Sequence, residues 1–373
     1  MPIRAGSGPM KIAILGIKGV PGHHGVEVVV DSLIPHLVSL GHEITVYGYE
    51  GYAAATDDYR GARVRTVGGS SRKNAEMISH MWNASVATRS ERFDIAHIHS
   101  TDPCLLAWLP KARLGIVATS HGQAYLRKKW GVAARMMSKL AERFFIYVPA
   151  ASTCVSKPLC DYYRAAYRRE VIYIPNGITP REAPPASLLE RWNIAPGSYL
   201  FCSAGRIERT KGLSTLLEAY RMAGSGLPLI VAGGGASTDT AYFEELRRSA
   251  PAGVRFVGFL TGDQYYALFA HARVFIFPSE YEAMSMALLE GLSFGAPTIY
   301  SDTPENEAVA GDLGFPFRVS DAASLAERLG DVLAHPAEAQ ALAAKAKEAV
   351  RARHDWAAVA RQYHDLYLEI AAR

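Results

Sequence analysis

Two carboxylates that stand eight residues apart, Glu282 and Glu290, could accept hydrogen bonds from the hydroxyl groups of a sugar. Apolar residues 274–277 predict a buried parallel strand that ends at Pro278, and residues 285–292 predict the helix that follows. Helical side chains lean toward the N-terminus, so the Glu290 carboxylate can reach a ligand at the strand's carboxyl end. N–H groups at the helix start favour an anion such as a diphosphate. The pattern points to a sugar-nucleotide site, but for an arbitrary pair of glutamates at this spacing a carboxylate pair on a surface helix is the more common arrangement, so the wider context of the chain decides between the two.

Two cations, Arg206 and Lys211, follow a second apolar strand at residues 199–204. When a glycosyl bond to a phosphate breaks, negative charge grows on the departing phosphate, and fixed cations stabilise that transition state. They can do so in place of a metal ion, and no Asp-x-Asp metal motif stands in a suitable loop. A solvated surface pair is the alternative. Gly205 and Gly212 favour the functional interpretation, because such glycines mark close backbone approach.

Short apolar runs alternate with helical segments along the 373 residues, which predicts a doubly wound α/β protein with two units. Gly, Ser or His follows the runs at the edge where open α/β sheets bind ligands. We therefore expect two Rossmann-like domains that face each other across a cleft. The expected strands cover residues 11–15, 43–47, 95–99, 116–119 and 151–155, then 199–204, 228–232, 254–257, 274–277 and 297–300.

The domain boundary is expected where prolines crowd a segment with little periodic pattern. The last segment carries apolar residues at helical spacing, which predicts a long amphipathic helix. The predicted parts are a disordered extension at 1–9, an N-terminal acceptor-side domain at 10–178, a linker at 179–196, a C-terminal nucleotide-sugar domain at 197–352 and a helix at 353–373.

A glycine-rich loop at residues 16–25 follows the first predicted strand but does not match G-x-G-x-x-G. The end of the second strand also lacks a convincing acidic residue, although Glu50 is nearby, so a dinucleotide dehydrogenase is disfavoured. Gly19 and Gly25 would let the backbone approach a ligand that a side chain would block. A turn needed only for packing is the alternative.

One histidine, His121, follows the strand at 116–119 and precedes Gly122, at the ligand-binding edge of the first unit. A lone histidine after a strand more often has a structural role. The other candidates His23, His24, His97 and His99 are spread around separate strands, so their spacing does not suggest a metal cluster.

Composition is consistent with a cytoplasmic enzyme. No window reaches the ~18 uninterrupted apolar residues of a membrane span, and no secretory signal pattern opens the chain. The four cysteines Cys104, Cys154, Cys160 and Cys202 lack metal-binding spacing and suit a reducing compartment.

Charge is divided unevenly between the two halves. Residues 1–180 carry 22 Lys and Arg against 13 Asp and Glu, whereas residues 181–373 carry 18 against 23. A basic N-terminal half suggests contact with an anionic membrane surface or a lipid diphosphate. Residues 127–144 interleave basic and apolar side chains and fit a basic amphipathic helix; a solvated helix face is the alternative.

Several motifs together resemble one known family. The segment 277–290 with 295–297 resembles the signature of retaining glycosyltransferases of family 4, which have two facing Rossmann-like domains in the arrangement called GT-B. Segment 205–212 is similar to that family's Arg and Lys pair, 175–178 to its interdomain turn, and the resemblance covers residues 10–370. Segments 18–27, 121–123 and 127–131 look most like a bacterial branch often described as rhamnosyltransferases.

The resemblance implies a cytoplasmic enzyme, in part peripheral at the inner membrane face, that transfers a hexosyl or deoxyhexosyl unit with retention. The donor would be a nucleoside diphosphate sugar, and the acceptor a glycan or a lipid-linked molecule in cell-surface polysaccharide synthesis. It implies no metal, no other cofactor and no nucleic acid partner. The implied catalytic residues are His121, Arg206, Lys211 and Glu282. The implied donor-binding residues are Gly19, Gly25, Gly205, Ala283, Met284, Ser285, Met286 and Glu290.

Within the resemblance, Glu282 contacts sugar hydroxyls, Glu290 contacts the nucleotide ribose, and His121 contacts the donor hexose. The last helix crosses back to cover the N-terminal domain. Residues 283–285 are Ala-Met-Ser where the family commonly has Gly-Phe-Gly. Two alternatives stay open: a GT-B sugar-nucleotide epimerase that needs no acceptor, and a catalytically silent protein that binds sugar nucleotides.

Overall fold

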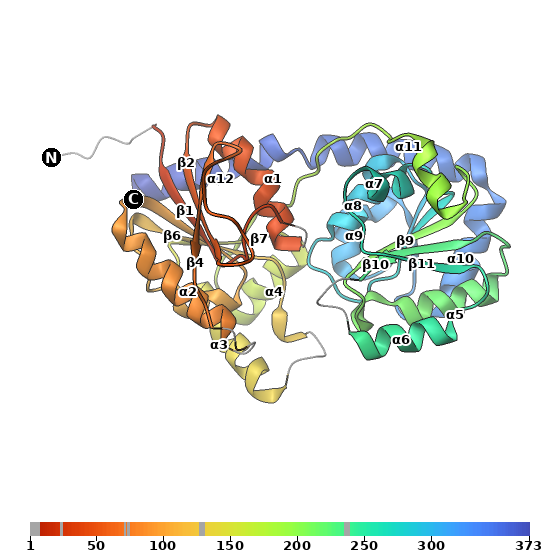
Figure 1. Cartoon of the computed structure of the whole chain (residues 1–373), viewed down its shortest axis with the longest axis horizontal. Coiled ribbons are helices and arrows are strands. Elements are labelled where there is room, and N and C mark those ends of the chain that lie inside the picture. The colour runs from red at the N-terminus through yellow and green to blue at the C-terminus, as the bar shows by residue number, and fades with distance from the viewer. Residues whose placement is uncertain (1–7, 23–24, 71, 73–74, 127–130, 235–238) are drawn as a thin grey trace. The chain divides into compact units, whose positions relative to one another are not determined.

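The structure is a computed structural model that describes residues 8–22, 25–70, 72, 75–126, 131–234 and 239–373. Its contacts divide the chain into two compact units (Figure 1). Unit 1 comprises Met1–Gly177 and His354–Arg373, and unit 2 comprises Ile178–Arg353. Each unit is an α/β structure around a parallel sheet, as the alternation of apolar runs and helical segments predicts.

Unit 1 contains an eight-stranded sheet in which all neighbours pair in parallel except β3 and β4. β1 lies between β2 and β5 in the interior of the sheet. Its residues after Lys11 are all buried, as expected for a parallel strand that helices cover on both faces. The strands, in spatial order, are β3 (Thr56–Tyr59), β4 (Ala62–Val67), β2 (Glu43–Tyr49), β1 (Lys11–Leu15), β5 (Phe93–His99), β6 (Ala112–Ser120), β7 (Ala151–Cys154) and β8 (Ile172–Tyr173).

The helices of unit 1 bury apolar stripes against this sheet. α1 packs against α12, whereas α2 and α3 both pack against the 3-10 helix η2. These elements are α1 (Gly25–Ser39), α2 (Glu76–Ala87), η1 (Thr88–Ser90), η2 (Asp102–Leu106), η3 (Ala124–Leu126), α3 (Val132–Tyr147), α4 (Lys157–Tyr167) and α12 (Trp356–Ala372).

The last helix, α12, belongs to unit 1 although the preceding helices belong to unit 2. Its apolar positions are buried, and Asp355 caps its start by accepting a hydrogen bond from the Ala358 N–H. Two tyrosine hydroxyls on α12 also satisfy buried polar groups of the sheet: Tyr367 lies 2.7 Å from His97 Nδ1 and Tyr363 lies 3.2 Å from Thr119 Oγ1. Buried polar groups need such partners, so these contacts fix the helix register.

Unit 2 contains a six-stranded parallel sheet in the order β11-β10-β9-β12-β13-β14. Its core is formed by apolar strand residues and by helix residues that face them. The strands are β9 (Leu200–Gly205), β10 (Leu229–Gly233), β11 (Val254–Gly258), β12 (Val274–Phe277), β13 (Thr298–Ser301) and β14 (Phe315–Phe317). The helices are α5 (Leu213–Ala223), α6 (Thr240–Ser249), α7 (Gly262–Ala270), α8 (Met286–Phe294), α9 (Pro304–Ala310), α10 (Ala322–Ala334) and α11 (Pro336–Arg353).

The segment 179–196, expected as a linker, lies within unit 2. It contains the 3-10 helix η4 (Ala186–Trp192), which packs against α7 and buries Leu189. Leu188, Leu189 and Trp192 gave no periodic signal strong enough to predict this turn.

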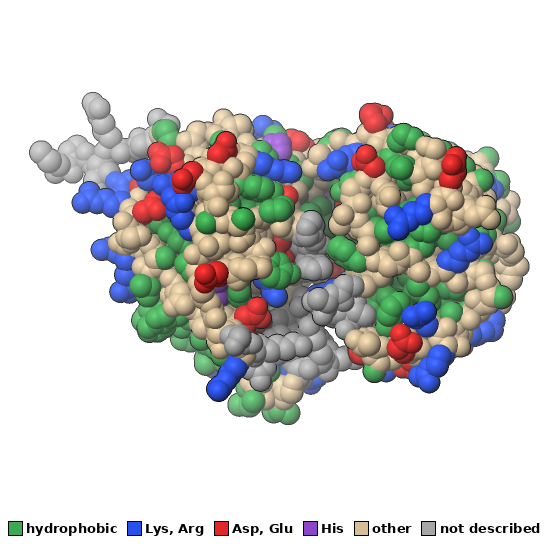
Figure 2. All heavy atoms as spheres, in the orientation of Figure 1, with side chains coloured by type: hydrophobic (Ala, Val, Ile, Leu, Met, Phe, Trp, Pro, Cys, Tyr) green, Lys and Arg blue, Asp and Glu red, His purple; other side chains and the backbone are tan. Residues whose placement is uncertain are grey.

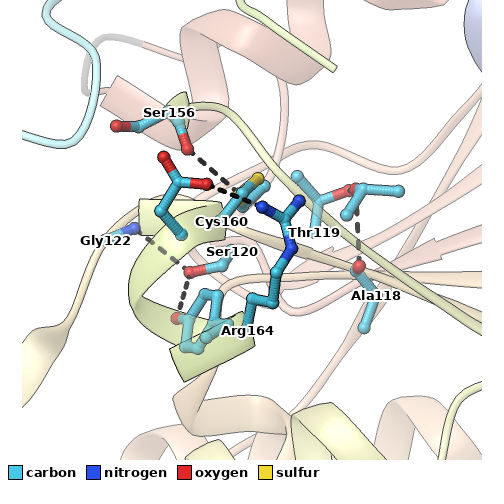
Figure 3. The surroundings of a disulfide bond; sticks show 11 residues. Ala118, Thr119, Ser120, Gly122, Ser156, Cys160 and Arg164 are labelled. Carbon is cyan, nitrogen blue, oxygen red and sulfur yellow. Dashed lines mark hydrogen bonds and ion pairs between the residues drawn. A yellow bond between two sulfur atoms is a disulfide. The ribbon is translucent and has the colours of Figure 1, made fainter. Parts of the chain in front are cut away.

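Two of the four cysteines are paired, which the sequence analysis did not predict. Cys154 at the end of β7 and Cys160 in α4 form a disulfide with a Cα–Cα distance of 6.2 Å (Figure 3). Their separation of six residues carried no pairing signal, but the chain reverses between the strand and the helix and brings the two together. Cys104 and Cys202 are free and buried. Among the described helices, none combines the length and apolar character needed to cross a bilayer.

Candidate donor site in unit 2

The residues predicted from two motifs lie together in unit 2 because two loops meet. Lys211 ends the 3-10 turn η5 (Arg209–Lys211), and Gly212 follows it with a φ of +65°. A Cβ atom at Gly212 would lie 1.9 Å from the carbonyl oxygen of Pro278. The loop after β9 therefore approaches the loop after β12 as closely as backbone atoms permit, and only glycine fits there.

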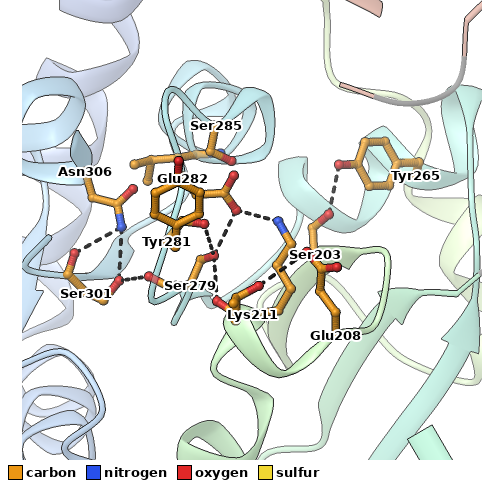
Figure 4. A network of polar contacts seen from close by, with 12 residues as sticks. Ser203, Glu208, Lys211, Tyr265, Ser279, Tyr281, Glu282, Ser285, Ser301 and Asn306 are labelled. Atoms are coloured by element: carbon orange, nitrogen blue, oxygen red, sulfur yellow. Dashed lines mark hydrogen bonds and ion pairs between the residues drawn. The ribbon is translucent and has the colours of Figure 1, made fainter. Parts of the chain in front are cut away.

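Across this contact Lys211 and Glu282 form an ion pair. The Lys211 Nζ lies 2.5 Å from Glu282 Oε1, and Ser279 Oγ donates to the same oxygen at 2.8 Å (Figure 4). The Glu280 N–H donates to the Thr210 carbonyl at 2.8 Å, which ties the two loops through their backbones. Both charged side chains are less than one-fifth exposed, so water screens their attraction less than on an open surface.

Behind the loop, Ser301 and Asn306 hold it in place. Ser301 Oγ donates to the Ser279 carbonyl, and Asn306 Nδ2 donates to both the carbonyl and the Oγ of Ser301 (Figure 4). Thr303 caps α9 by accepting from the Asn306 N–H. The sequence analysis missed these supporting residues because they lie 22 to 27 positions from Ser279 in the chain and share no motif with it.

The predicted helix after Glu282 is α8, which starts at Met286 with Ser285 as its N-cap. Ser285 accepts from the Leu288 N–H at 3.4 Å, Met284 is buried, and Ala283 is partly buried. The N-terminus of α8 thus follows directly on the loop that carries Glu282. Helix N-termini attract anions, so this placement suits a phosphate group near Lys211.

Glu290 lies inside α8 and is 8% exposed. Tyr265 on α7 donates to its Oε2 at 3.0 Å, and Ser203 Oγ lies 2.9 Å from the same phenol oxygen. Burial raises the pKa of Glu290 to about 7, opposed by the Tyr265 hydrogen bond and the charge of Arg181. Ser203 is on β9, so Tyr265 links the Glu290 carboxylate to the central part of the sheet. The sequence analysis missed Tyr265 and Ser203, which only the tertiary structure brings to Glu290.

Arg206 follows Gly205 at the end of β9 and is partly buried. Gly205 has a φ of +59° and open space around its Cβ position, so its backbone conformation, and not crowding, requires glycine. Arg206 and Lys211 therefore lie in one loop at the carboxyl edge of the sheet, where open α/β sheets bind ligands.

The remaining predicted residues lie in unit 1. His121 directly follows β6, and its Nε2 lies 3.1 Å from His99 Nδ1. Burial lowers the pKa of His121 to about 4, so its imidazole is neutral at pH 7. Gly19 has a φ of +138°, and a Cβ there would lie 2.6 Å from the Ala53 Cβ, so both its backbone conformation and its packing require glycine. Gly25 opens α1 with open space around it.

Other histidine predictions also receive an answer. His97 makes hydrogen bonds to Tyr367 and Thr119 inside the sheet, which is a structural role. His23 and His24 lie outside the described residues. Within the described ranges, no three His, Cys, Asp or Glu side chains are grouped to hold a metal ion.

Two sequence families match the chain. The family described as Glycosyltransferase Family 4 matches residues 23–182, and the family described as Glycosyl transferases group 1 matches residues 187–349. The first match lies in unit 1 except for residues 178–182, which belong to unit 2. The second match lies entirely in unit 2.

Among individual proteins, a glycogen synthase of Mycobacterium tuberculosis is 31% identical over 204 residues, which cover 53% of this chain and 48% of that protein. The chain thus matches about half the length of this relative. A GDP-mannose:cellobiosyl-diphosphopolyprenol alpha-mannosyltransferase of Komagataeibacter xylinus is 28% identical over 298 residues, with 75% of this chain and 72% of that protein covered.

The fold also has solved counterparts. The structure of Anabaena HepE in complex with UDP-glucose superimposes with a TM-score of 0.78 at 15% identity, covering 96% of this chain and 99% of that one. At that identity the likeness concerns the fold, and it confirms the expected arrangement of two parallel-sheet α/β domains. The chain therefore carries a Glycosyltransferase Family 4 domain followed by a Glycosyl transferases group 1 domain, and it has the GT-B fold.

Proposed function

We propose that the chain is a retaining glycosyltransferase that transfers a hexosyl or deoxyhexosyl unit from a nucleoside diphosphate sugar. The acceptor is a glycan or a lipid-linked molecule in cell-surface polysaccharide synthesis. The observation that carries the proposal is the contact of Lys211 with Glu282 beside the N-terminus of α8, with Glu290 in the same helix. Cation, helix N-terminus and carboxylates are the groups that a diphosphate joined to two sugars requires.

The ion pair defines what donor binding changes. In the structure, Glu282 forms an ion pair with Lys211. When a nucleotide sugar binds, its diphosphate takes the Lys211 ammonium and a hexose hydroxyl donates to Glu282. Lys211 and Arg206 then stabilise the charge that develops on the leaving diphosphate, so the chemistry needs no metal ion. Ala283, Met284, Ser285 and Met286 supply backbone near the donor.

Glu290 accepts hydrogen bonds from the nucleotide ribose in this proposal, because a carboxylate offers only acceptors. His121 acts as a neutral hydrogen-bonding group toward the donor hexose, consistent with its lowered pKa. Gly19 and Gly25 keep their predicted roles at the loop of unit 1, although the Ala53 contact gives Gly19 a packing role as well.

Two comparisons support the proposed chemical class of donor and acceptor. The mannosyltransferase relative is named for GDP-mannose and a diphosphopolyprenol, and HepE was solved with UDP-glucose. A nucleoside diphosphate hexose and a lipid diphosphate are thus the first substrates to test. Rhamnose as the sugar rests on the resemblance of segments 18–27 and 121–123 to rhamnosyltransferases; segment 127–130 lies outside the described residues.

Turnover tests the proposal. We expect purified protein to be stabilised by one of the UDP, dTDP, GDP or ADP sugars, since a ligand that binds only the native state raises apparent stability. We expect it to transfer that sugar with retained anomeric configuration. An isomerised sugar in the absence of acceptor would instead identify an epimerase. Stabilisation without any turnover would identify a silent binding protein. If the protein showed neither stabilisation nor turnover, the proposal would be refuted.

We further propose that unit 1 contacts an anionic membrane through α3. Val132, Met136 and Leu140 recur every fourth residue and are 76%, 68% and 45% exposed, and exposed Arg135 and Lys139 flank them. Apolar and basic side chains occur together at the lower end of unit 1, where α3 lies (Figure 2). An apolar stripe beside cations matches a bilayer with acidic headgroups.

Vesicle sedimentation tests this membrane contact. We expect the protein to sediment with phosphatidylglycerol vesicles and not with phosphatidylcholine vesicles, and the Met136→Ser/Leu140→Ser variant to lose most of that binding. Met222→Ser is the matched control, because Met222 is 56% exposed on α5 in unit 2. Equal sedimentation of both variants would refute a role for α3.

A further inference from the structure

Tyr265 reaches the donor site from a helix that no motif identifies. It lies on α7 and is partly buried, and its phenol oxygen contacts two groups at once. The hydroxyl donates to Glu290 Oε2 at 3.0 Å and lies 2.9 Å from Ser203 Oγ on β9. Figure 4 shows the Tyr265 hydroxyl directed at Ser203. Three elements of unit 2, α7, α8 and β9, therefore meet at this oxygen.

The contact constrains Glu290 in two ways. The Tyr265 hydroxyl donates to Oε2, so Oε1 is the oxygen that we assign to a ligand. It also donates to a carboxylate whose position inside α8 excludes most water, where a hydrogen bond is worth more than in solvent.

Among the described residues, the charge of Arg181 also acts on Glu290. Arg181 acts on it from the segment before η4, with its guanidinium over the Tyr266 ring at 4.6 Å from the ring centre. Burial of Glu290 favours its neutral form, and Tyr265 and Arg181 favour the charged form. A carboxylate that is half protonated near pH 7 is a weaker acceptor of two hydrogen bonds than an ionised one.

We propose that Tyr265 is a positioning residue of the donor site: its hydrogen bond to Oε2 orients the Glu290 carboxylate and leaves Oε1 toward the ribose hydroxyls of a nucleoside diphosphate. This inference rests on the proposed function, because it assigns the ribose to Glu290. Tyr265 itself need not touch the ligand. Its effect is transmitted through the charge and orientation of one carboxylate.

The proposal predicts a specific pH profile of nucleotide affinity. With a pKa of about 7, Glu290 is about nine-tenths ionised at pH 8 and about one-tenth ionised at pH 6. The affinity for a nucleoside diphosphate should therefore fall about tenfold over that range. Tyr265→Phe removes the donor, so the pKa of Glu290 rises and the loss of affinity begins at higher pH.

Isothermal titration with UDP and GDP from pH 6 to 9 tests this in wild type, Tyr265→Phe and Tyr242→Phe. Tyr242 is the matched control, because its hydroxyl lies 2.9 Å from Ser214 Oγ, a hydroxyl group, whereas the Tyr265 hydroxyl also donates to a carboxylate. We expect Tyr265→Phe to bind at least about threefold more weakly at pH 7 and to approach wild type at pH 9. Inorganic pyrophosphate, which lacks ribose, should bind wild type and Tyr265→Phe equally.

The outcomes separate this inference from the proposed function. If wild type binds neither nucleotide nor pyrophosphate, the proposed donor site is wrong. If wild type binds a nucleotide but Tyr265→Phe shows the same pH profile, only the role of Tyr265 is refuted. If Tyr265→Phe lost affinity for nucleotide and pyrophosphate equally at every pH, the substitution would have damaged unit 2 in general. That result would also refute the proposed role of Tyr265. The phosphate of the nucleotide also titrates, but it does so equally with wild type and Tyr265→Phe, so the difference between their pH profiles does not contain this effect.

Discussion

The backbone contact at Gly212 leads to a sharp prediction. In Gly212→Ala the new Cβ lies 1.9 Å from the Pro278 carbonyl oxygen, so the two loops must separate by at least about 1 Å to reach a 3.0 Å contact. Lys211 precedes Gly212 and Ser279 follows Pro278, so this movement pulls Lys211 away from Glu282. We expect weaker binding of the donor diphosphate as a direct result.

The matched control is Gly224→Ala. Gly224 caps α5 with a φ of +51°, close to the +65° of Gly212, but its Cβ position is open. Both variants share the cost of left-handed alanine, about 1 to 2 kcal/mol. Gly212→Ala adds the cost of an overpacked contact, about 1 to 3 kcal/mol. The difference between the variants isolates the loop contact.

Urea unfolding followed by circular dichroism measures the stability part, and titration with the preferred nucleotide measures the binding part. We expect Gly224→Ala to keep wild-type affinity and Gly212→Ala to be both less stable and at least about tenfold weaker in binding. Equal stability and equal affinity of the two variants would refute the idea that this contact sets the site.

Three further predictions concern single groups. Lys211→Ala should lower kcat/KM for the donor about 100-fold, as loss of a transition-state cation does, whereas Arg209→Ala, which removes a cation paired with Glu245, should change it little; steady-state kinetics decide. Glu290→Gln should flatten the pH dependence of stability. Glu290 gains a proton more readily in the folded state, so wild type loses on the order of 3 kcal/mol as pH rises from 4.5 to 7, measured by urea unfolding. Reduction of the Cys154–Cys160 disulfide should lower the free energy of unfolding by about 2 kcal/mol, and a Cys160→Ser variant should not respond to the reductant.

The fold was largely predictable because buried parallel strands leave continuous apolar runs in the sequence. The expected runs at 11–15 and 274–277 are β1 and β12 with the same bounds, and the other eight expected strands are present with shifted ends. β3, β4, β8 and β14 were not predicted. β3, β8 and β14 are short strands at sheet edges, where a strand needs only one partner and leaves a weak pattern. β4 lies between β3 and β2, but its basic residues Arg63 and Arg65 interrupt the apolar run.

The candidate site was predictable only along the chain. Motifs placed Arg206, Lys211, Glu282 and Glu290 at strand ends, but no spacing indicated that Lys211 pairs with Glu282 across 71 positions. Tyr265 could not be found either, because a tyrosine in an amphipathic helix looks like a core residue. Such partners are selected by how helices and strands pack, which local sequence does not encode.

The most direct test of the central claim is a crystal structure of the chain with the nucleotide sugar that stabilises it most. We predict a complex in which the diphosphate lies within hydrogen-bond distance of Lys211 Nζ, with the ribose hydroxyls on Glu290 Oε1 and a hexose hydroxyl on Glu282. A nucleotide bound away from the loops 205–212 and 278–286, or a Lys211–Glu282 ion pair left intact beside a bound diphosphate, would contradict it.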